Sequence, residues 1–284
     1  MPRLLRRLND LAIFDAARWP AREVVGRILG CLLAVGFIAG RILRLPNSVG
    51  YIRAVRWAEP WFATFSSLPK WLVPPAVDLE AYYFRFGYSR EQVTLFWALS
   101  LGLWAVITGS FIAYLIAYLT RAKAQSVAKG FLETAFPVIV AALPLLTVLT
   151  RFTYRDWFPE HTETHMTGLY VILSVLIAGG LLHLIGLLGL RRGFTIMSEA
   201  RVLIRTGLHR WIRHPIYTSH FLINLCFTLL YFHATTVALY ALFVAGQTLR
   251  ARTEERKLAA VFPEYEEYRR TTGMFFPRLW RRAL

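Results

Sequence analysis

The sequence contains only two cysteines, Cys31 and Cys226, and both lie inside long apolar runs. Their spacing fits neither a disulfide framework nor a metal site, so both are predicted to be small buried apolar residues, and the redox compartment stays undetermined. The chain also lacks a Gly-x-Gly-x-x-Gly motif, a P-loop, an internal repeat and a low-complexity tract. The dinucleotide-binding and nucleotide-binding folds that those two motifs indicate are therefore not expected.

Acidic residues are scarce, with 17 Asp and Glu against 33 Lys and Arg, which gives a formal net charge of +16. Many nucleic-acid-binding proteins are also basic, but here the positive charge is spread over loops and termini without a basic stripe. Positive charge beside apolar spans more often marks the cytoplasmic side of a membrane and its anionic lipid headgroups. We therefore predict a protein surrounded by membrane lipids, with no nucleic-acid partner.

Apolar sequence is abundant and comes in blocks. Of the 284 residues 56% are hydrophobic, and the mean hydropathy is +0.43. A soluble domain of this size would be closer to half apolar and would alternate its pattern, whereas unbroken blocks indicate membrane spans. We predict an all-α, polytopic membrane helix bundle with about six spans. The expected spans are Val24–Ile42, Val93–Leu119, Phe131–Thr150, Gly168–Leu190, Ile216–His233 and Thr235–Leu249.

The chain divides into three predicted parts. Residues 1–92 hold an amphipathic region, the first span and a tryptophan-rich interfacial segment; residues 93–190 hold transmembrane helices; and residues 191–284 hold the C-terminal functional region. The positive-inside rule predicts that both termini are cytoplasmic. The basic segments that it places on that side are 1–27, 120–130, 191–215 and 250–284.

The stretch "RWIRHPIYTSHF", residues 210–221, opens the fifth predicted span. Pro215 suits the first turn of a helix, where its missing N–H costs nothing. Arg213 and His214 then lie just before a helix start, whose free N–H groups and positive end favour an anion or a hydrogen-bond acceptor. Tyr217 falls in the same turn and offers a hydroxyl group.

A second polar stretch, "RTEERKLAAVFPEYEEY", follows the sixth predicted span. No proline interrupts it before Pro263, so the helix is predicted to continue beyond the membrane. Glu254 and Glu255 are adjacent and point about 100° apart, while Arg252 and Glu255 can meet at three-residue spacing. Because the last two spans are joined tightly, they are predicted to form an antiparallel hairpin. That hairpin would bring both polar stretches to one membrane surface, around a polar pocket.

Together, the two stretches resemble the isoprenylcysteine carboxyl methyltransferase and phospholipid methyltransferase family. The Arg-His-Pro-x-Tyr motif of that family corresponds to residues 213–217, and its Glu-Glu-x-x-Leu helix corresponds to Glu254, Glu255 and Leu258. The later aromatic and proline positions correspond to Phe262, Tyr265, Tyr268 and Pro277. The resemblance covers residues 185–280, and it departs from the family pattern at Ser219 and Pro263, where glycine is usual.

The resemblance implies an integral-membrane methyltransferase with S-adenosylmethionine as cofactor, bound in a cytoplasmic pocket of the C-terminal region. It assigns cofactor binding to His214, Pro215, Tyr217, Glu254 and Glu255. It places Arg213 close to the reacting centre, and we predict that Arg213 and Glu255 are catalytic. The cofactor is already an activated electrophile, so the protein mainly positions it and the acceptor, and no metal is expected.

The implied acceptor is a lipid-like or prenylated small molecule that enters from the bilayer, and its chemistry stays open. A carboxylate, as in isoprenylcysteine, would need a cation such as Arg213 or Arg252. A phospholipid amine would need a carboxylate such as Glu255 or Glu133, and a small thiol is a third alternative. His220, one turn from Tyr217, is a further candidate for the pocket. The sequence does not determine the oligomeric state.

Two other classes of protein are compatible with the sequence. A membrane sterol reductase that uses NADPH would share the C-terminal architecture, although its motif differs at positions 214–220, and a non-enzymatic membrane scaffold is the other alternative. Among the remaining histidines, His183 is predicted to hydrogen-bond a neighbouring helix rather than to act in function. His161 and His165 are predicted to lie in a solvated loop rather than in a metal site.

Overall fold

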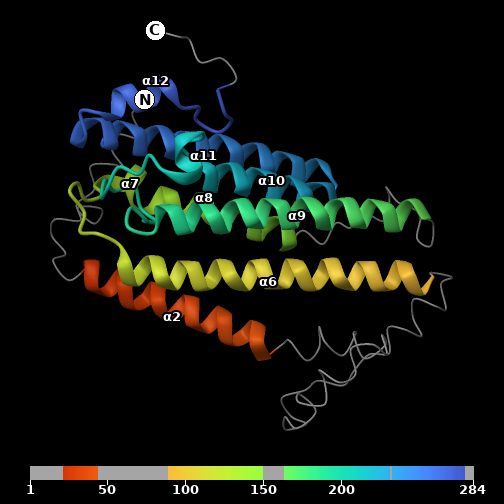
Figure 1. Ribbon diagram of the computed structural model, residues 1–284. Helices are drawn as coiled ribbons and strands as arrows, with labels where there is room; N and C mark the ends of the chain where they lie inside the picture. Colours follow the sequence, from red (N-terminus) through yellow and green to blue (C-terminus); the bar gives the residue numbers. More distant parts are fainter. Residues whose placement is uncertain (1–21, 44–88, 150–162, 231, 279–284) are drawn as a thin grey trace.

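The computed structural model describes residues 22–43, 89–149, 163–230 and 232–278, and within these ranges it contains helices and no β-strand (Figure 1). The helices are α2 (Arg22–Leu43), α6 (Arg90–Thr120), α7 (Gly130–Glu133), α8 (Ala135–Leu149), α9 (Glu163–Leu190), the 3-10 helix η6 (Gly207–Arg210), α10 (Pro215–Leu230), α11 (Ala234–Val261) and α12 (Tyr265–Thr271). The predicted all-α class is confirmed. The interfacial segment predicted within residues 43–92 and the side chains of His161 and His165 lie outside this description.

Two helical stretches within the described residues are long and apolar enough to cross a membrane, Thr94–Thr120 in α6 and Thr167–Leu190 in α9. Three shorter apolar stretches coincide with other predicted spans: Val25–Gly40, Ala135–Pro144 and Pro215–Leu230. The sixth predicted span forms the first half of α11. A membrane helix bundle is therefore supported, while the number of spans remains a prediction.

The outward faces of these helices are apolar, as a hydrocarbon solvent requires. Along α2, a row of large apolar side chains is at least 50% exposed: Val25, Ile28, Leu29, Leu32, Leu33, Val35 and Phe37. Polar side chains such as Thr108, Ser110 and His183 are instead buried between helices. A soluble protein rarely exposes so continuous an apolar surface, whereas a membrane helix presents it to lipid.

Small residues allow the helices to approach closely. A Cβ atom added at Gly180 of α9 would lie 2.6 Å from Val106 Cγ1 of α6. At Gly246 of α11 it would lie 2.8 Å from Val140 Cγ2 of α8. Glycine at such positions is typical of membrane helix interfaces, where packing rather than the hydrophobic effect holds helices together.

Replacing Gly180 with alanine should lower the melting temperature of the detergent-solubilised protein. The added methyl group must displace a β-branched side chain, and overpacking of this kind costs about 1–3 kcal/mol. Gly36→Ala is the matched control, because a Cβ at Gly36 meets nothing within 4 Å. Alanine favours helix at both positions, so the two variants differ in packing alone. Equal melting temperatures for the two variants would contradict this account of the interface.

The third predicted span is divided in the structure. The short helix α7 ends at Glu133, Thr134 follows, and α8 then begins at Ala135. The predicted extension of the last span into the polar "RARTEERKLAAV" segment is confirmed, because α11 continues to Val261 and stops just before Pro263. Helix α9 begins at Glu163, earlier than the predicted Gly168.

The ends of α6, α9 and α11 and the start of α10 gather at one end of the bundle (Figure 1). The loop 191–214 connects them: Ala122 N–H donates to the Arg192 carbonyl (2.8 Å), and Ser126 and Ala200 form an isolated β-bridge. Three of the four segments that were predicted to be cytoplasmic therefore meet at the same end of the molecule. This end carries the site.

Candidate active site

The Arg-His-Pro-x-Tyr motif is held in place by the chain that follows α12. The backbone N–H groups of Arg213 and His214 donate to the carbonyls of Gly273 (2.8 Å) and Met274 (3.0 Å). One turn into α10, the Thr218 hydroxyl donates to the Phe275 carbonyl (2.7 Å). These bonds satisfy groups just before a helix start and fix the direction in which the motif side chains point.

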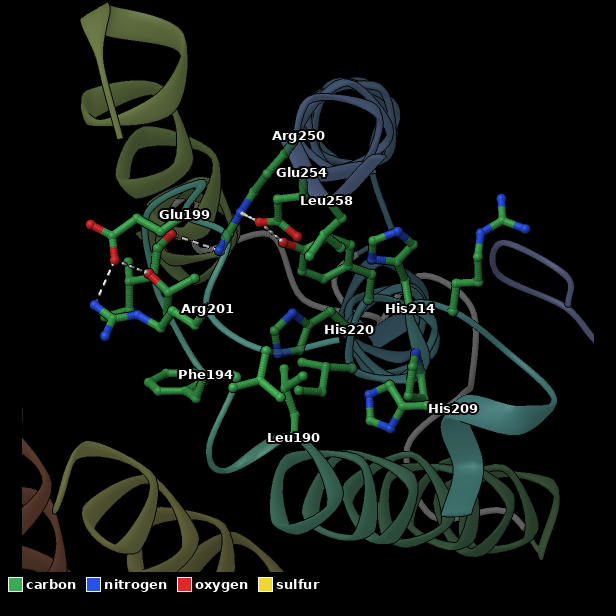
Figure 2. Close-up of a pocket in the computed structure, with 18 of the residues that line it drawn as sticks. Leu190, Phe194, Glu199, Arg201, His209, His214, His220, Arg250, Glu254 and Leu258 are labelled. Carbon is green, nitrogen blue, oxygen red and sulfur yellow. Dashed lines mark hydrogen bonds and ion pairs between the residues drawn. The ribbon is translucent and has the colours of Figure 1, made fainter. Parts of the chain in front are cut away.

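Glu254 of α11 forms an inner cluster with Tyr217 and Arg250 (Figure 2). Glu254 Oε1 accepts hydrogen bonds from the Tyr217 hydroxyl (2.6 Å) and from Arg250 Nε (3.0 Å). The Arg250 guanidinium also lies 5.1 Å from the centre of the Tyr217 ring and donates to the Ile196 carbonyl (2.6 Å). Both contacts to Glu254 use the same oxygen. From the described residues, Oε2 accepts no hydrogen bond, so this oxygen is available to a ligand.

The neighbouring acidic residue, Glu255, forms an outer cluster with Arg213 and His214. Glu255 Oε1 accepts from Arg213 Nε at 2.7 Å and lies 3.1 Å from His214 Nε2. The Arg213 guanidinium also donates to the carbonyls of Arg269 (3.0 Å) and Thr272. The paired side chains of Arg213 and Glu255 are 8% and 9% exposed, so this ion pair is largely shielded from water. Arg213 is therefore held rigidly, at three acceptors.

Burial alone would raise the pKa of Glu255, but hydrogen bonds from His214 and Arg213 and their positive charge lower it to about 2. Glu255 is thus a carboxylate at any physiological pH. This residue acts on the site by holding Arg213 and His214.

Two cavities adjoin these clusters. The inner cavity has a volume of about 260 Å³ and is lined by residues of α6, α8, α9, α10, α11 and the loop 191–214, among them Phe194, His209, His214, Tyr217, His220, Arg250 and Glu254. The outer cavity has a volume of about 660 Å³ and is more open, with Arg252, Glu255 and Arg269 in its wall. Among the described residues, Arg213 alone lines both cavities.

The structure distributes the predicted site residues over these two spaces. The inner cavity is lined by Arg213, His214, Pro215, Tyr217, His220 and Glu254. Glu255 and Arg252 line the outer cavity instead. Glu133 lies in neither, because its carboxylate accepts from Lys257 Nζ (2.6 Å) and from the Lys129 N–H (2.7 Å). Glu133 thereby ties α7 to α11, which does not favour its predicted contact with the acceptor.

Sequence reasoning missed several residues of the inner cavity. Arg250 is 7% exposed and stands four residues before Glu254, a spacing that predicts a pair on one helix face. Glu199 and Arg201 form a buried ion pair (2.6 Å), and both line this cavity (Figure 2). These two lie in the irregular loop 191–214, where no periodic pattern could have indicated their burial.

His183 forms the predicted contact with a neighbouring helix, since its Nδ1 lies 3.3 Å from Ser219 Oγ of α10. Ser219 stands where the family pattern usually has glycine, which has no side chain, so this contact depends on the departure from the pattern. The His183 ring also stacks on His220, with ring centroids 4.9 Å apart. His220 thus connects the inner cavity to a histidine inside the bundle.

In the described part of the chain, no group of three or more His, Cys, Asp or Glu side chains could hold a metal ion.

His209 predicts a pH dependence of stability. It is 3% exposed, and burial, helped by the charge of His214, lowers its pKa to about 4. The unfolded chain therefore binds a proton more readily, and stability should fall by about 3 kcal/mol as pH falls from about 6.5 to 4. Melting curves between pH 7.5 and 4 should show a shallower loss of stability in His209→Gln than in the wild type, because the contribution of His209 is removed. A slope unchanged in His209→Gln would contradict the assignment.

The donor set of the inner cavity fits S-adenosylmethionine, which carries an ammonium group, a carboxylate, ribose hydroxyls and an aromatic base. A carboxylate and a guanidinium face the same space beside the rings of Tyr217 and Phe194. His209 Nδ1 is buried and has no hydrogen-bond partner among the described residues, which leaves a further ring nitrogen for a ligand. A zwitterion with an aromatic end finds a partner for each of its parts here.

Within the described residues, the structure is all-helical, with two helices long and apolar enough to cross a membrane and a site of charged and apolar side chains at the basic end of the bundle. The model of the isoprenylcysteine carboxyl methyltransferase (ICMT) family matches residues 171–260, which contain both motifs. The resemblance predicted from the sequence is thereby confirmed, and the match supports a membrane methyltransferase.

Two curated relatives were also found. The chain is 28% identical over 163 residues to the nickel-cobalt-cadmium resistance protein NccN of Alcaligenes xylosoxydans xylosoxydans. This alignment covers 50% of this chain and 73% of that protein. The chain is also 38% identical over 78 residues to the cobalt-zinc-cadmium resistance protein CzcN of Cupriavidus metallidurans (strain ATCC 43123 / DSM 2839 / NBRC 102507 / CH34). This alignment covers 27% of this chain and 36% of that protein. The second match thus spans about a third of the relative's length.

Proposed function

We propose that the chain is an integral-membrane, S-adenosylmethionine-dependent methyltransferase that acts on a lipid-like acceptor. The observation that carries the proposal is the convergence of the two motifs, in which Tyr217 bonds Glu254 at the inner cavity and Arg213, which lines both cavities, bonds Glu255. Because the basic segments meet at this end of the bundle, we place the site on the cytoplasmic face, with both termini on the same side.

When bound, S-adenosylmethionine supplies an activated methyl group. Glu254 would hold its ammonium group or ribose hydroxyls, and Arg250 or the N–H groups at the start of α10 would hold its carboxylate. Tyr217 would fix Glu254 through the existing hydrogen bond, and His214 and Pro215 would form the wall beside it. The cofactor role predicted for Glu255 becomes an indirect one under this arrangement, since its carboxylate faces Arg213 and the outer cavity.

Arg213 would orient the acceptor. Arg213 lines the inner cavity, and the bonds from its guanidinium to Glu255, Arg269 and Thr272 keep the side chain in one position. A fixed, forked cation suits a carboxylate acceptor, as in isoprenylcysteine, and so we favour that class. A phospholipid amine and a small thiol remain the alternatives, and His220 is the cavity residue placed to take a proton from either.

Isothermal titration of the purified protein in detergent tests the cofactor. We expect saturable binding of S-adenosylmethionine and of its product S-adenosylhomocysteine, and no binding of NADPH. Binding of NADPH alone would favour the sterol reductase class, and binding of neither would favour a scaffold. Expression with a labelled methyl donor, followed by mass spectrometry of host lipids and prenylcysteine compounds, would then identify the acceptor class.

A contribution to resistance against divalent metals is a second candidate, because the names of both relatives refer to such resistance. We expect expression of the chain to raise the nickel, cobalt or cadmium concentration at which a sensitive host stops growing. The Arg213→Ala variant is the control. If it protects as well as the wild type, the resistance does not depend on methyl transfer.

A further inference from the structure

The outer cavity carries an excess of positive charge. Five arginines line it, Arg213, Arg252, Arg256, Arg269 and Arg278, against two glutamates, Glu255 and Glu266. The two carboxylates are already engaged, since Glu255 pairs with Arg213 (2.7 Å) and Glu266 pairs with Arg269 (2.7 Å). Within the described residues, the remaining three arginines have no acidic partner.

These three guanidinium groups are accessible, and two of them are aligned. Arg252 and Arg256 are exposed and stand one turn apart on α11, so their side chains lie on the same face of that helix. Arg256 donates to the Arg252 carbonyl (3.3 Å) and to Thr253 Oγ1 (3.1 Å), which orients it without neutralising its charge. Arg278, in the segment after α12, lines the same cavity, and its guanidinium donates to the Arg270 carbonyl. An anion placed here would therefore meet cations from two separate segments of the chain.

The cavity also has an apolar part. Leu249, Ala259 and Met274 contribute to its wall, and Leu249 is the last residue of the predicted sixth span. Arg252 follows one turn later. The cavity thus begins where α11 is expected to leave the hydrocarbon and extends toward the basic end of the bundle, at the depth of lipid headgroups.

We propose that the outer cavity binds the phosphate group of an anionic phospholipid, with the guanidinium groups of Arg252, Arg256 and Arg278 around the phosphate and the lipid chains toward Leu249. Arginine forks bind phosphate oxygens in pairs, and several of them can share one phosphate group. The volume of about 660 Å³ lies within the range of small-molecule sites. Because Arg213 also lines this cavity, a bound headgroup would lie beside the residue that faces the inner site.

Titration of the full chain in dodecyl maltoside with phosphatidylglycerol, followed by tryptophan fluorescence or native mass spectrometry, tests the proposal. Each basic residue near an anionic surface contributes about 1 kcal/mol, or about fivefold in affinity. Arg252→Ala/Arg256→Ala should therefore weaken phosphatidylglycerol binding by about 30-fold. The matched control is Arg191→Ala/Arg192→Ala, which removes the same charge from two exposed arginines that line neither cavity.

The control variant should bind phosphatidylglycerol as the wild type does, and phosphatidylcholine should bind to none of the proteins with comparable affinity. Equal weakening in both double variants would overturn the proposal, because it would indicate a general effect of surface charge. A competing titration with inorganic phosphate separates the two sources of the group. If free phosphate binds as tightly as the lipid, the lipid part of the proposal fails, and if it competes only weakly, the lipid is supported.

Discussion

Arg213→Ala should lower the rate of methyl transfer at least about 100-fold, the usual effect of removing one fixed donor at a reacting centre. Arg213 is the one described residue that lines both cavities, and three acceptors hold its guanidinium in place. Arg213→Lys should be nearly as inactive, since an ammonium group cannot reproduce the forked contacts. The measurement is transfer of a labelled methyl group to acceptor in detergent micelles.

Arg210→Ala is the matched control for charge. Arg210 stands three residues earlier, lies 5.0 Å from the Trp211 ring and is exposed, so its loss should leave turnover close to that of the wild type. Full activity in Arg213→Ala, or equal loss in both variants, would contradict the assignment of Arg213 to the reacting centre.

Folding must be separated from chemistry in this series, because Arg213→Ala removes the arginine partner of the buried Glu255 and leaves only His214 beside it. Breaking a buried pair from one side typically costs about 3–5 kcal/mol. The double variant Arg213→Ala/Glu255→Gln removes that stranded charge and should recover much of the melting temperature without recovering turnover. Recovery of turnover in the double variant would show that Arg213 acts only through stability.

Glu254→Gln should weaken binding of S-adenosylmethionine at least about tenfold, because hydrogen bonds to charged groups contribute about 1.5–3 kcal/mol. The same change leaves Arg250 buried beside a neutral amide and should also lower the melting temperature. Tyr217→Phe should have a smaller effect on affinity, since it removes a donor that positions Glu254 and leaves the carboxylate in place. Isothermal titration measures the affinities, and thermal unfolding measures the stability.

Glu267→Gln is the control for this pair, as Glu267 is an exposed carboxylate on α12 that lines neither cavity. It should bind the cofactor as the wild type does. If Glu254→Gln also binds normally once its stability is matched by lowering the temperature, Glu254 does not contact the cofactor.

The sequence by itself determined the class of the fold and selected the motif residues that line the candidate site. Long apolar blocks predict helices because a backbone in hydrocarbon must satisfy its own hydrogen bonds, and this rule operates locally. The absence of proline before Pro263 predicted the full length of α11 for the same local reason. The motif residues Arg213, His214 and Tyr217 could be selected because a helix start after a basic loop has a recognisable chemistry.

Only the tertiary structure decided which cavity each of these residues lines. Adjacent positions on a helix point in different directions, but the sequence does not say what lies in each direction, so Glu254 and Glu255 could not be assigned to separate cavities. Glu133 was predicted as a residue that could contact the acceptor, whereas in the structure its carboxylate pairs with Lys257, 124 positions away in the sequence. His209 and the Glu199–Arg201 pair line the inner cavity because of the fold of the irregular loop 191–214. Contacts between distant segments arise from packing, and no local pattern records them.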